Sequence, residues 1–418
     1  MSGVGFTAQW LAAPGVSSPE LAATWARFAV DVAGTPATLV REVGATGEAD
    51  YRGAIFVSPY PLAEWMAYNW WALTTPHRGG VLRFDSAGDG FAWPPLQLEP
   101  QPGGFVATQR PRLDSLQRVE YVARVYTFVD RDDTLYSLGR FVDSVVQRLE
   151  SEGIEGTPLQ DEWDAILATS DEEERFCRAA ASLGLDPWNI GDGEFETVAQ
   201  ALESVGALAP EVLAASNHKT ATEAVAWVAA GLSALNTIEL RTSPVEALRS
   251  AAQPDIHERS FELDARTPWR IGFARARSLR ERLGLDATDG FDLSDIVGLE
   301  EVAAPAPGII EGVGRVGRDV RIAVPEARPE AGRRLLQVRA LSRALFDTDG
   351  PQLITKGTSV RDRIERAFAV ETLAPASGIA ELLRGDYSES AQLRAADHFG
   401  VDQLVVAHQI ENQLLRAS

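Results

Sequence analysis

One short segment, QVRALSRALF at residues 337–346, constrains more than any other how this chain can fold. Val338, Leu341 and Leu345 recur at helical spacing, so the segment predicts a buried helix. Arg339 and Arg343 are four residues apart and therefore share one face of that helix. A guanidinium group is always charged, and a buried charge needs a partner. The segment therefore raises the question of which carboxylates face this helix.

The length and composition are those of a globular protein with more than one domain. The chain has 418 residues, which favours two or three domains, and its 45% apolar and 24% charged residues are close to the averages of soluble proteins. No apolar run is long enough to span a membrane, and the first ten residues have no signal-peptide pattern. We therefore expect a cytoplasmic protein without a membrane segment. The single cysteine, Cys177, excludes an internal disulfide and is expected in the core.

The formal charge of −21 is unevenly distributed along the chain. Residues 1–265 carry 18 cationic and 38 anionic side chains, whereas the remaining residues carry 21 and 22. An acidic surface repels phosphate backbones and anionic lipids. The N-terminal part is therefore not expected to bind nucleic acid or a membrane.

Residue patterns divide the chain into three expected domains. Residues 1–130 are rich in tryptophan and contain strand-like runs around one apolar helix at 60–73, which predicts an acidic α+β domain. Residues 131–255 have helical spacing throughout, and Ser170 is the expected N-cap of one helix. A linker is expected at about 250–267, and residues 266–418 form the third domain. The predicted fold class is α+β, multi-domain and mostly helical.

The segment GVGRVG at residues 312–317 fits the glycine pattern of dinucleotide-binding loops. A strand-like run follows it, where a dinucleotide loop needs the N-terminus of a helix. We therefore interpret the segment as the turn of a β-hairpin, in a C-terminal region with one small sheet.

Two segments of the C-terminal third resemble stretches of the ImmA/IrrE family of HExxH metallopeptidases. RAFAVETLAP, residues 366–375, is similar to the family's N-x-F-A-x-E-x-L-x-P stretch, and HFGVDQLVVAHQIENQ, residues 398–413, is similar to its closing helix pair. The resemblance extends from Trp269 to about Leu415 and includes the order of helix, strand pair, active-site helix and second helix. It implies a zincin-like domain with a small sheet, in a family of bacterial stress responses and mobile elements.

The resemblance also implies which residues occupy the positions of the family's active site. Arg339 stands at the first histidine ligand, Ala340 at the general-base glutamate and Arg343 at the second histidine, while Asp362 aligns with the carboxylate ligand on the next helix. Arginine has no lone pair to offer zinc and repels the cation, and alanine cannot take a proton from water. The resemblance therefore predicts a degenerate site without catalytic residues, metal or cofactor.

The acid at residue 362 predicts a specific contact. A buried carboxylate without a metal needs a cation, and either arginine of the preceding helix can supply one. We therefore expect Asp362 to pair with Arg339 or Arg343, so that a guanidinium group replaces zinc as the link between the two helices. The alternative is that these residues are ordinary charges on exposed helix faces.

The expected function is that of a catalytically inactive ImmA/IrrE-like pseudopeptidase, which binds a protein partner or regulates one in a stress or phage response. Two alternatives stay open at this stage. One is a metal-dependent peptidase whose unconventional site uses Asp362, Glu365, Glu371 and His398. The other is a nucleic-acid-binding regulator that uses the arginine-rich segment 270–284. The sequence leaves open the oligomeric state and the role of the first 250 residues.

Overall fold

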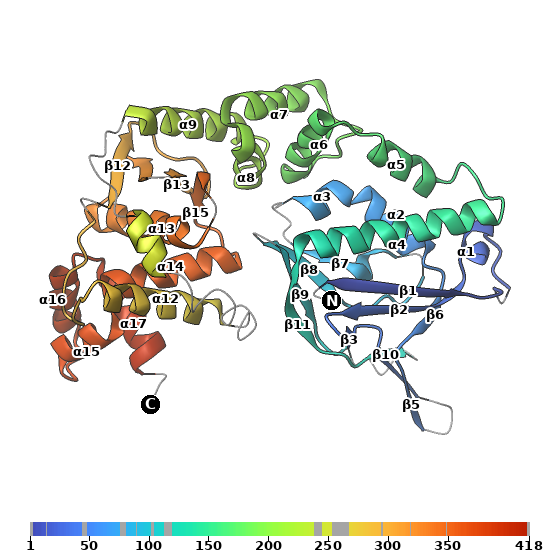
Figure 1. The fold of residues 1–418 in the computed structure, drawn as a ribbon, viewed down its shortest axis with the longest axis horizontal. Helices are drawn as coiled ribbons and strands as arrows, with labels where there is room; N and C mark the ends of the chain where they lie inside the picture. The colour runs from blue at the N-terminus through green and yellow to red at the C-terminus, as the bar shows by residue number, and fades with distance from the viewer. Residues whose placement is uncertain are drawn as a thin grey trace. The chain divides into compact units, whose positions relative to one another are not determined.

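A computed structural model describes most of the chain (Figure 1). The described residues are 3–13, 15–43, 48–75, 81–88, 90–101, 104–112, 119–237, 245–252, 267–293, 296–317, 319–347 and 349–415. Most of the expected linker at 250–267 lies outside them. The chain forms two compact units, Met1–Asn189 and Ile190–Ser418, which are described separately below. The boundary falls inside the expected helical domain, and the three-part division stays a prediction.

The fold is α+β, about 51% helical, with several small sheets, which confirms the predicted class at that level. In the described parts of the chain, no helix combines the length and the apolar character needed to cross a membrane.

The N-terminal unit contains the expected antiparallel sheets. Its first sheet pairs β2 with β1, β3 and β6, its second runs β10-β4-β5, and its third runs β11-β9-β8-β7. The strands are β1 (Val4–Trp10), β2 (Ala26–Val32), β3 (Thr35–Pro36), β4 (Val40–Val43), β5 (Ala49–Arg52), β6 (Ile55–Val57), β7 (Leu82–Arg83), β8 (Gln97–Gln101), β9 (Gly104–Gln109), β10 (Val119–Tyr121) and β11 (Val125–Asp130).

Helices cover the core of this unit. The expected helix at 60–73 is buried, as predicted, but it breaks at Asn69 into two helices, and the Asn69 side chain donates to the Trp65 carbonyl oxygen.

Ser170 caps its helix through a reciprocal contact with Glu173, as expected. Cys177 is buried, as expected, and burial raises the pKa of its thiol to about 11. The helices are α1 (Pro19–Ala23), α2 (Tyr60–Tyr68), α3 (Trp70–Thr74), α4 (Arg131–Ser151), α5 (Pro158–Leu167) and α6 (Asp171–Ser182).

The C-terminal unit is built around one four-stranded sheet in the order β12-β14-β13-β15. β12 runs parallel to β14, and the other pairs are antiparallel. Helix α9 (Ala221–Ala234) packs on one face, where Gly231 lies against Val313 and Ala323, and α13 (Glu330–Phe346) packs on the other (Figure 1). The strands are β12 (Val297–Val302), β13 (Ile310–Val316), β14 (Val320–Pro325) and β15 (Gly350–Thr355).

The segment GVGRVG belongs to a β-hairpin, but the prediction that it forms the turn is wrong for most of it, because residues 312–316 lie in strand β13. The chain reverses between Val316 and Val320, which face each other in the antiparallel pair. The strand β15, which the sequence analysis did not identify, adds the edge next to β13.

Helices α12 (Pro268–Arg282) and α14 (Val360–Leu373) pack closely against each other. Gly272 of α12 lies so close to α14 that a Cβ atom there would be 2.3 Å from the carbonyl oxygen of Ile364. The remaining helices of the unit are α7 (Asp192–Val205), α8 (Ala209–Ala214), α10 (Val245–Ala252), α12 (Pro268–Arg282), α14 (Val360–Leu373), α15 (Ala376–Leu383), α16 (Glu389–Phe399), α17 (Gln403–Gln409) and a π-helical turn at Ile410–Leu414.

Candidate functional site

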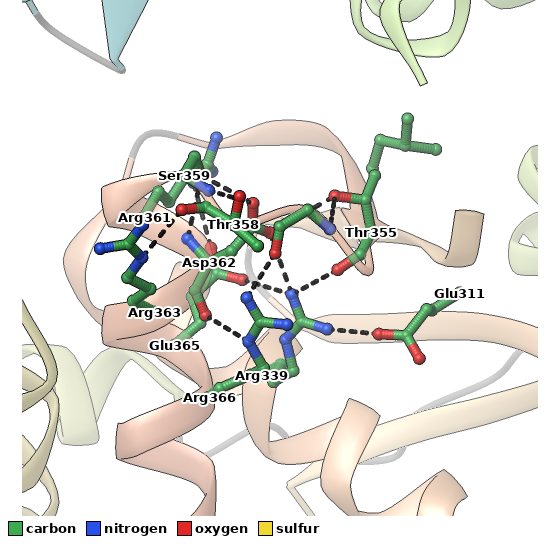
Figure 2. A network of polar contacts seen from close by, with 12 residues as sticks. Glu311, Arg339, Thr355, Thr358, Ser359, Arg361, Asp362, Arg363, Glu365 and Arg366 are labelled. Atoms are coloured by element: carbon green, nitrogen blue, oxygen red, sulfur yellow. Dashed lines mark hydrogen bonds and ion pairs between the residues drawn. The ribbon is translucent and has the colours of Figure 1, made fainter. Parts of the chain in front are cut away.

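Two of the four arginines of α13, Arg339 and Arg343, are buried and contact three carboxylates. Figure 2 shows Arg339 with Glu311, Asp362 and Glu365. We call Arg339, Arg343, Glu311, Asp362 and Glu365 the arginine–carboxylate cluster. Arg339 is 1% exposed, and no member is more than 8% exposed. The carboxylates that face the segment QVRALSRALF are therefore one on strand β13, Glu311, and two on helix α14, Asp362 and Glu365.

Arg339 lies at the centre of the arginine–carboxylate cluster. Its Nη1 is 2.7 Å from Oε2 of Glu311, and its Nη2 is 3.2 Å from Oδ1 of Asp362 and 3.4 Å from Oε2 of Glu365. Nη2 also donates to the carbonyl oxygen of Thr355 at the end of β15. The predicted pairing of Asp362 with an arginine of α13 is thereby confirmed, and the alternative of exposed surface charges is wrong.

Arg343 makes a two-pronged contact with Glu365. Its Nε and Nη2 donate to the two carboxylate oxygens at 2.8 and 3.2 Å, and its Nη1 donates to the carbonyl oxygen of Leu353 at 2.7 Å. Paired, charge-assisted hydrogen bonds of this kind fix geometry as well as charge. Arg339 and Arg343 therefore connect α13 both to α14 and to the edge strand β15.

A further arginine, on helix α14, contacts the arginine–carboxylate cluster. Arg361 lies one helical turn before Glu365, and its Nε is 3.1 Å from Oε1 of that residue. Arg361 also pairs with Asp347, and Glu311 pairs with Arg328 as well as with Arg339. Burial raises the pKa of Glu365, but the opposing attraction of Arg343, Arg339 and Arg361 is stronger, so the net effect lowers it.

Asp362 has a second structural role at the start of α14. Its Oδ2 accepts hydrogen bonds from the Ser359 hydroxyl at 2.6 Å and from the Ser359 backbone amide, while its own amide donates to the Ser359 hydroxyl. This is a capping box, which satisfies backbone groups that a helix start leaves free. One carboxylate therefore caps the helix with one oxygen and contacts Arg339 with the other.

Two members of the site lay outside the sequence prediction. Glu311 is the only acid of strand β13, whose other residues are apolar or glycine apart from Arg315, and that contrast was a signal that could have identified it. Arg361 is four residues before Glu365 on one helix face, which was a second available signal. Ala340, which the resemblance places at the general-base position, is 2% exposed and belongs to the hydrophobic core.

The structure does not assemble the unconventional metal site of the peptidase alternative. Glu371 instead contacts Arg277 at 2.8 Å and accepts hydrogen bonds from Gln409 and Gln413, and His398 bonds to the carbonyl oxygen of Thr288. Across the described ranges, no group of three or more His, Cys, Asp or Glu side chains could hold a metal ion. Glu371 belongs to segment 366–375, and Gln409 and Gln413 belong to segment 398–413, so these hydrogen bonds connect the two segments that resemble the ImmA/IrrE family.

Two of the five arginines of α12 are buried, and the other three, Arg270, Arg277 and Arg282, are exposed. Arg275 is buried with its guanidinium 4.2 Å from the centre of the Phe346 ring, and burial lowers its pKa to about 10. Arg280 is also buried and donates to the carbonyl oxygen of Thr372. Together with Arg277, which pairs with Glu371, they fix α12 within the unit.

Comparison with models of protein families gives no match for this chain, and comparison with curated protein sequences gives none either.

The lowered pKa of Glu365 predicts how stability depends on pH. A group whose pKa is lower in the folded state stabilises the fold above its unfolded pKa, about 4.3 for glutamate, and loses this contribution as the pH falls through the folded pKa. We expect the free energy of opening of α13 and α14, measured by hydrogen exchange, to fall between pH 7 and pH 3. Glu365→Gln should lower it at pH 7 and reduce its pH dependence. An unchanged slope in this variant would contradict the role of Glu365.

Proposed function

We propose that the C-terminal unit is a metallopeptidase-like domain that has lost its catalytic site and acts by binding a protein partner. The observation that carries the proposal is the arginine–carboxylate cluster. It lies at the positions that the resemblance assigns to the metal ligands, and guanidinium groups there connect the same two helices that a metal would connect.

The chemistry of the cluster supports loss of catalysis. Each carboxylate that could bind a cation faces a guanidinium group, and Arg339 and Arg343 provide only hydrogen-bond donors. A zinc ion would meet positive charge where it needs neutral imidazole. Ala340, at the position that the resemblance assigns to the general base, is packed in the core and has no group that could take a proton.

The test is to rebuild the motif and measure zinc. We expect wild-type protein, dialysed against trace zinc, to retain less than about a tenth of an equivalent by elemental mass spectrometry. The triple variant Arg339→His, Ala340→Glu, Arg343→His should retain about one equivalent, with Asp362 or Glu365 as the third ligand, and zinc should raise its melting temperature. Adding Asp362→Ala and Glu365→Ala to this variant is the control that should abolish binding.

Two outcomes would contradict the proposal. About one equivalent of zinc in the wild-type protein would show that other residues complete a metal site. A triple variant that folds but binds no zinc would show that α13 and α14 are not placed as in a zincin.

The binding role needs a separate measurement. The full-length chain is expected to co-purify from its own host cells with a protein in a fixed ratio, and chelation by EDTA should leave that ratio unchanged because no metal takes part. A complex that EDTA dissociates, or no partner in a fixed ratio, would contradict this part of the proposal.

A further inference from the structure

A pocket of about 710 Å³ lies at one end of the sheet in the C-terminal unit. The loops that follow β12 and β14 form two of its walls, and Ile310 and Lys356 border it from β13 and the segment after β15. Because β12 and β14 are parallel, the carboxyl ends of both strands lie at this pocket. The carboxyl ends of parallel strands are a common place for ligands in α/β proteins.

Hydrogen bonds hold the walls of this pocket in place. The amide of Glu326 donates to the Val302 carbonyl oxygen at 3.1 Å, which joins the two loops. The indole of Trp227 donates to the Ala304 carbonyl oxygen at 2.9 Å. The amide of Lys356 donates to the Ile309 carbonyl oxygen at 2.7 Å. A pocket formed before binding loses little conformational freedom when a ligand enters.

The lining is apolar except for three charged side chains. Small apolar residues at 303–306, together with Ile310 and Pro325, make up most of the surface. Of the charged groups, Arg328 is already paired with Glu311 of the arginine–carboxylate cluster. Lys356 is exposed, and its ammonium group has no ion pair or hydrogen bond among the described residues.

The lining therefore selects for one kind of ligand. An ammonium group without a partner attracts an anion, and a carboxylate can contact it by a charge-assisted hydrogen bond. The apolar wall favours a hydrocarbon body, and the additional acid at Glu326 disfavours ligands with several negative charges. From these features we infer that this pocket binds a small organic monocarboxylate with an apolar body, with Lys356 as the carboxylate contact. The inference does not depend on the proposed loss of peptidase activity.

The lysine content of the chain makes a direct test possible. Lys356 and Lys219 are the only lysines, so reductive ¹³C-methylation, which keeps the positive charge, gives two lysine signals beside that of the amino terminus. Lys356→Arg and Lys219→Arg assign them. Titration of the full chain with hexanoate should move the Lys356 signal and leave the Lys219 signal in place, with hexanol and hexylammonium as uncharged and oppositely charged controls.

Binding by unmodified protein gives the second measurement. Calorimetry with hexanoate should show an affinity about tenfold weaker in Lys356→Met, a loss of about 1.4 kcal/mol, and an unchanged affinity in Lys219→Met. Both lysines are exposed, so neither variant is expected to unfold. Equal shifts of the two signals, an equal response to hexanol, or no response to hexanoate would overturn the inference.

The same experiment distinguishes two sources of the carboxylate. An acetylated Ala-Leu dipeptide with a free carboxyl end represents the end of a peptide chain, and its amide is the control. Tighter binding of this dipeptide than of hexanoate would assign the pocket to a peptide terminus, and the opposite order would assign it to a free acid.

Discussion

Arg339→Met is expected to lower the free energy of opening of α13 and α14 by about 3–5 kcal/mol, since removal of one partner of a buried ion pair leaves charge without compensation. Methionine fills much of the same space but cannot balance Glu311, Asp362 and Glu365, all of which contact Arg339. Native-state hydrogen exchange of the full chain measures this free energy locally, which avoids treating two units as one unfolding transition.

The matched control for this variant is Arg282→Met. Arg282 is exposed and has no ion pair among the residues that the structure describes, so its replacement should change the free energy of opening by less than about 0.5 kcal/mol. Adding Asp362→Asn to Arg339→Met should recover part of the loss, because Asp362 has no other ion pair among the described residues, whereas Glu311 and Glu365 keep Arg328 and Arg343. If Arg339→Met is no more harmful than Arg282→Met, the arginine–carboxylate cluster does not hold these helices together.

Gly272→Ala is expected to destabilise the C-terminal unit by about 1–3 kcal/mol, the usual range for overpacking, although alanine is the better helix former. A Cβ atom at Gly272 would lie 2.3 Å from the Ile364 carbonyl oxygen and 2.8 Å from the Phe368 amide nitrogen. These are backbone atoms, so no side chain can turn aside and α12 must move away from α14.

The matched control for the glycine substitution is Gly193→Ala in α7, where no atom lies within 4 Å of the added Cβ and helix propensity alone acts. This variant should be neutral or slightly more stable. Hydrogen exchange of α14 in both variants is the measurement, and equal protection in the two would show that the close approach at Gly272 relaxes without cost.

The sequence was sufficient for features that depend on local spacing. The helical pattern around Ser170 and the apolar helix at 60–73 could be inferred because each follows from residues close in sequence. The pairing of Asp362 with α13 was predicted from the family resemblance, which aligned residue 362 with a ligand on the next helix. The break at Asn69 was missed, since its side-chain contact with the Trp65 carbonyl competes with a helix pattern that is otherwise continuous.

Features that depend on tertiary contact could not be inferred in the same way. Spacing placed the arginines of α12 on a helix face but did not show that Arg275 would be covered by Phe346, or that Arg277 would meet Glu371 from a distant segment. The pocket beside Lys356 is formed by four separate segments, which only the sheet order brings together.

The two contacts of Asp362 place evolutionary limits on residue 362. Exchange to asparagine would keep part of the helix cap but remove the charge that Arg339 requires, and exchange to glutamate would move the carboxylate away from the Ser359 hydroxyl. An acquired substitution here would therefore impair helix initiation and charge balance together, so compensation would require changes at two other residues. Such coupling predicts that residue 362 tolerates substitution less well than a residue with a single contact.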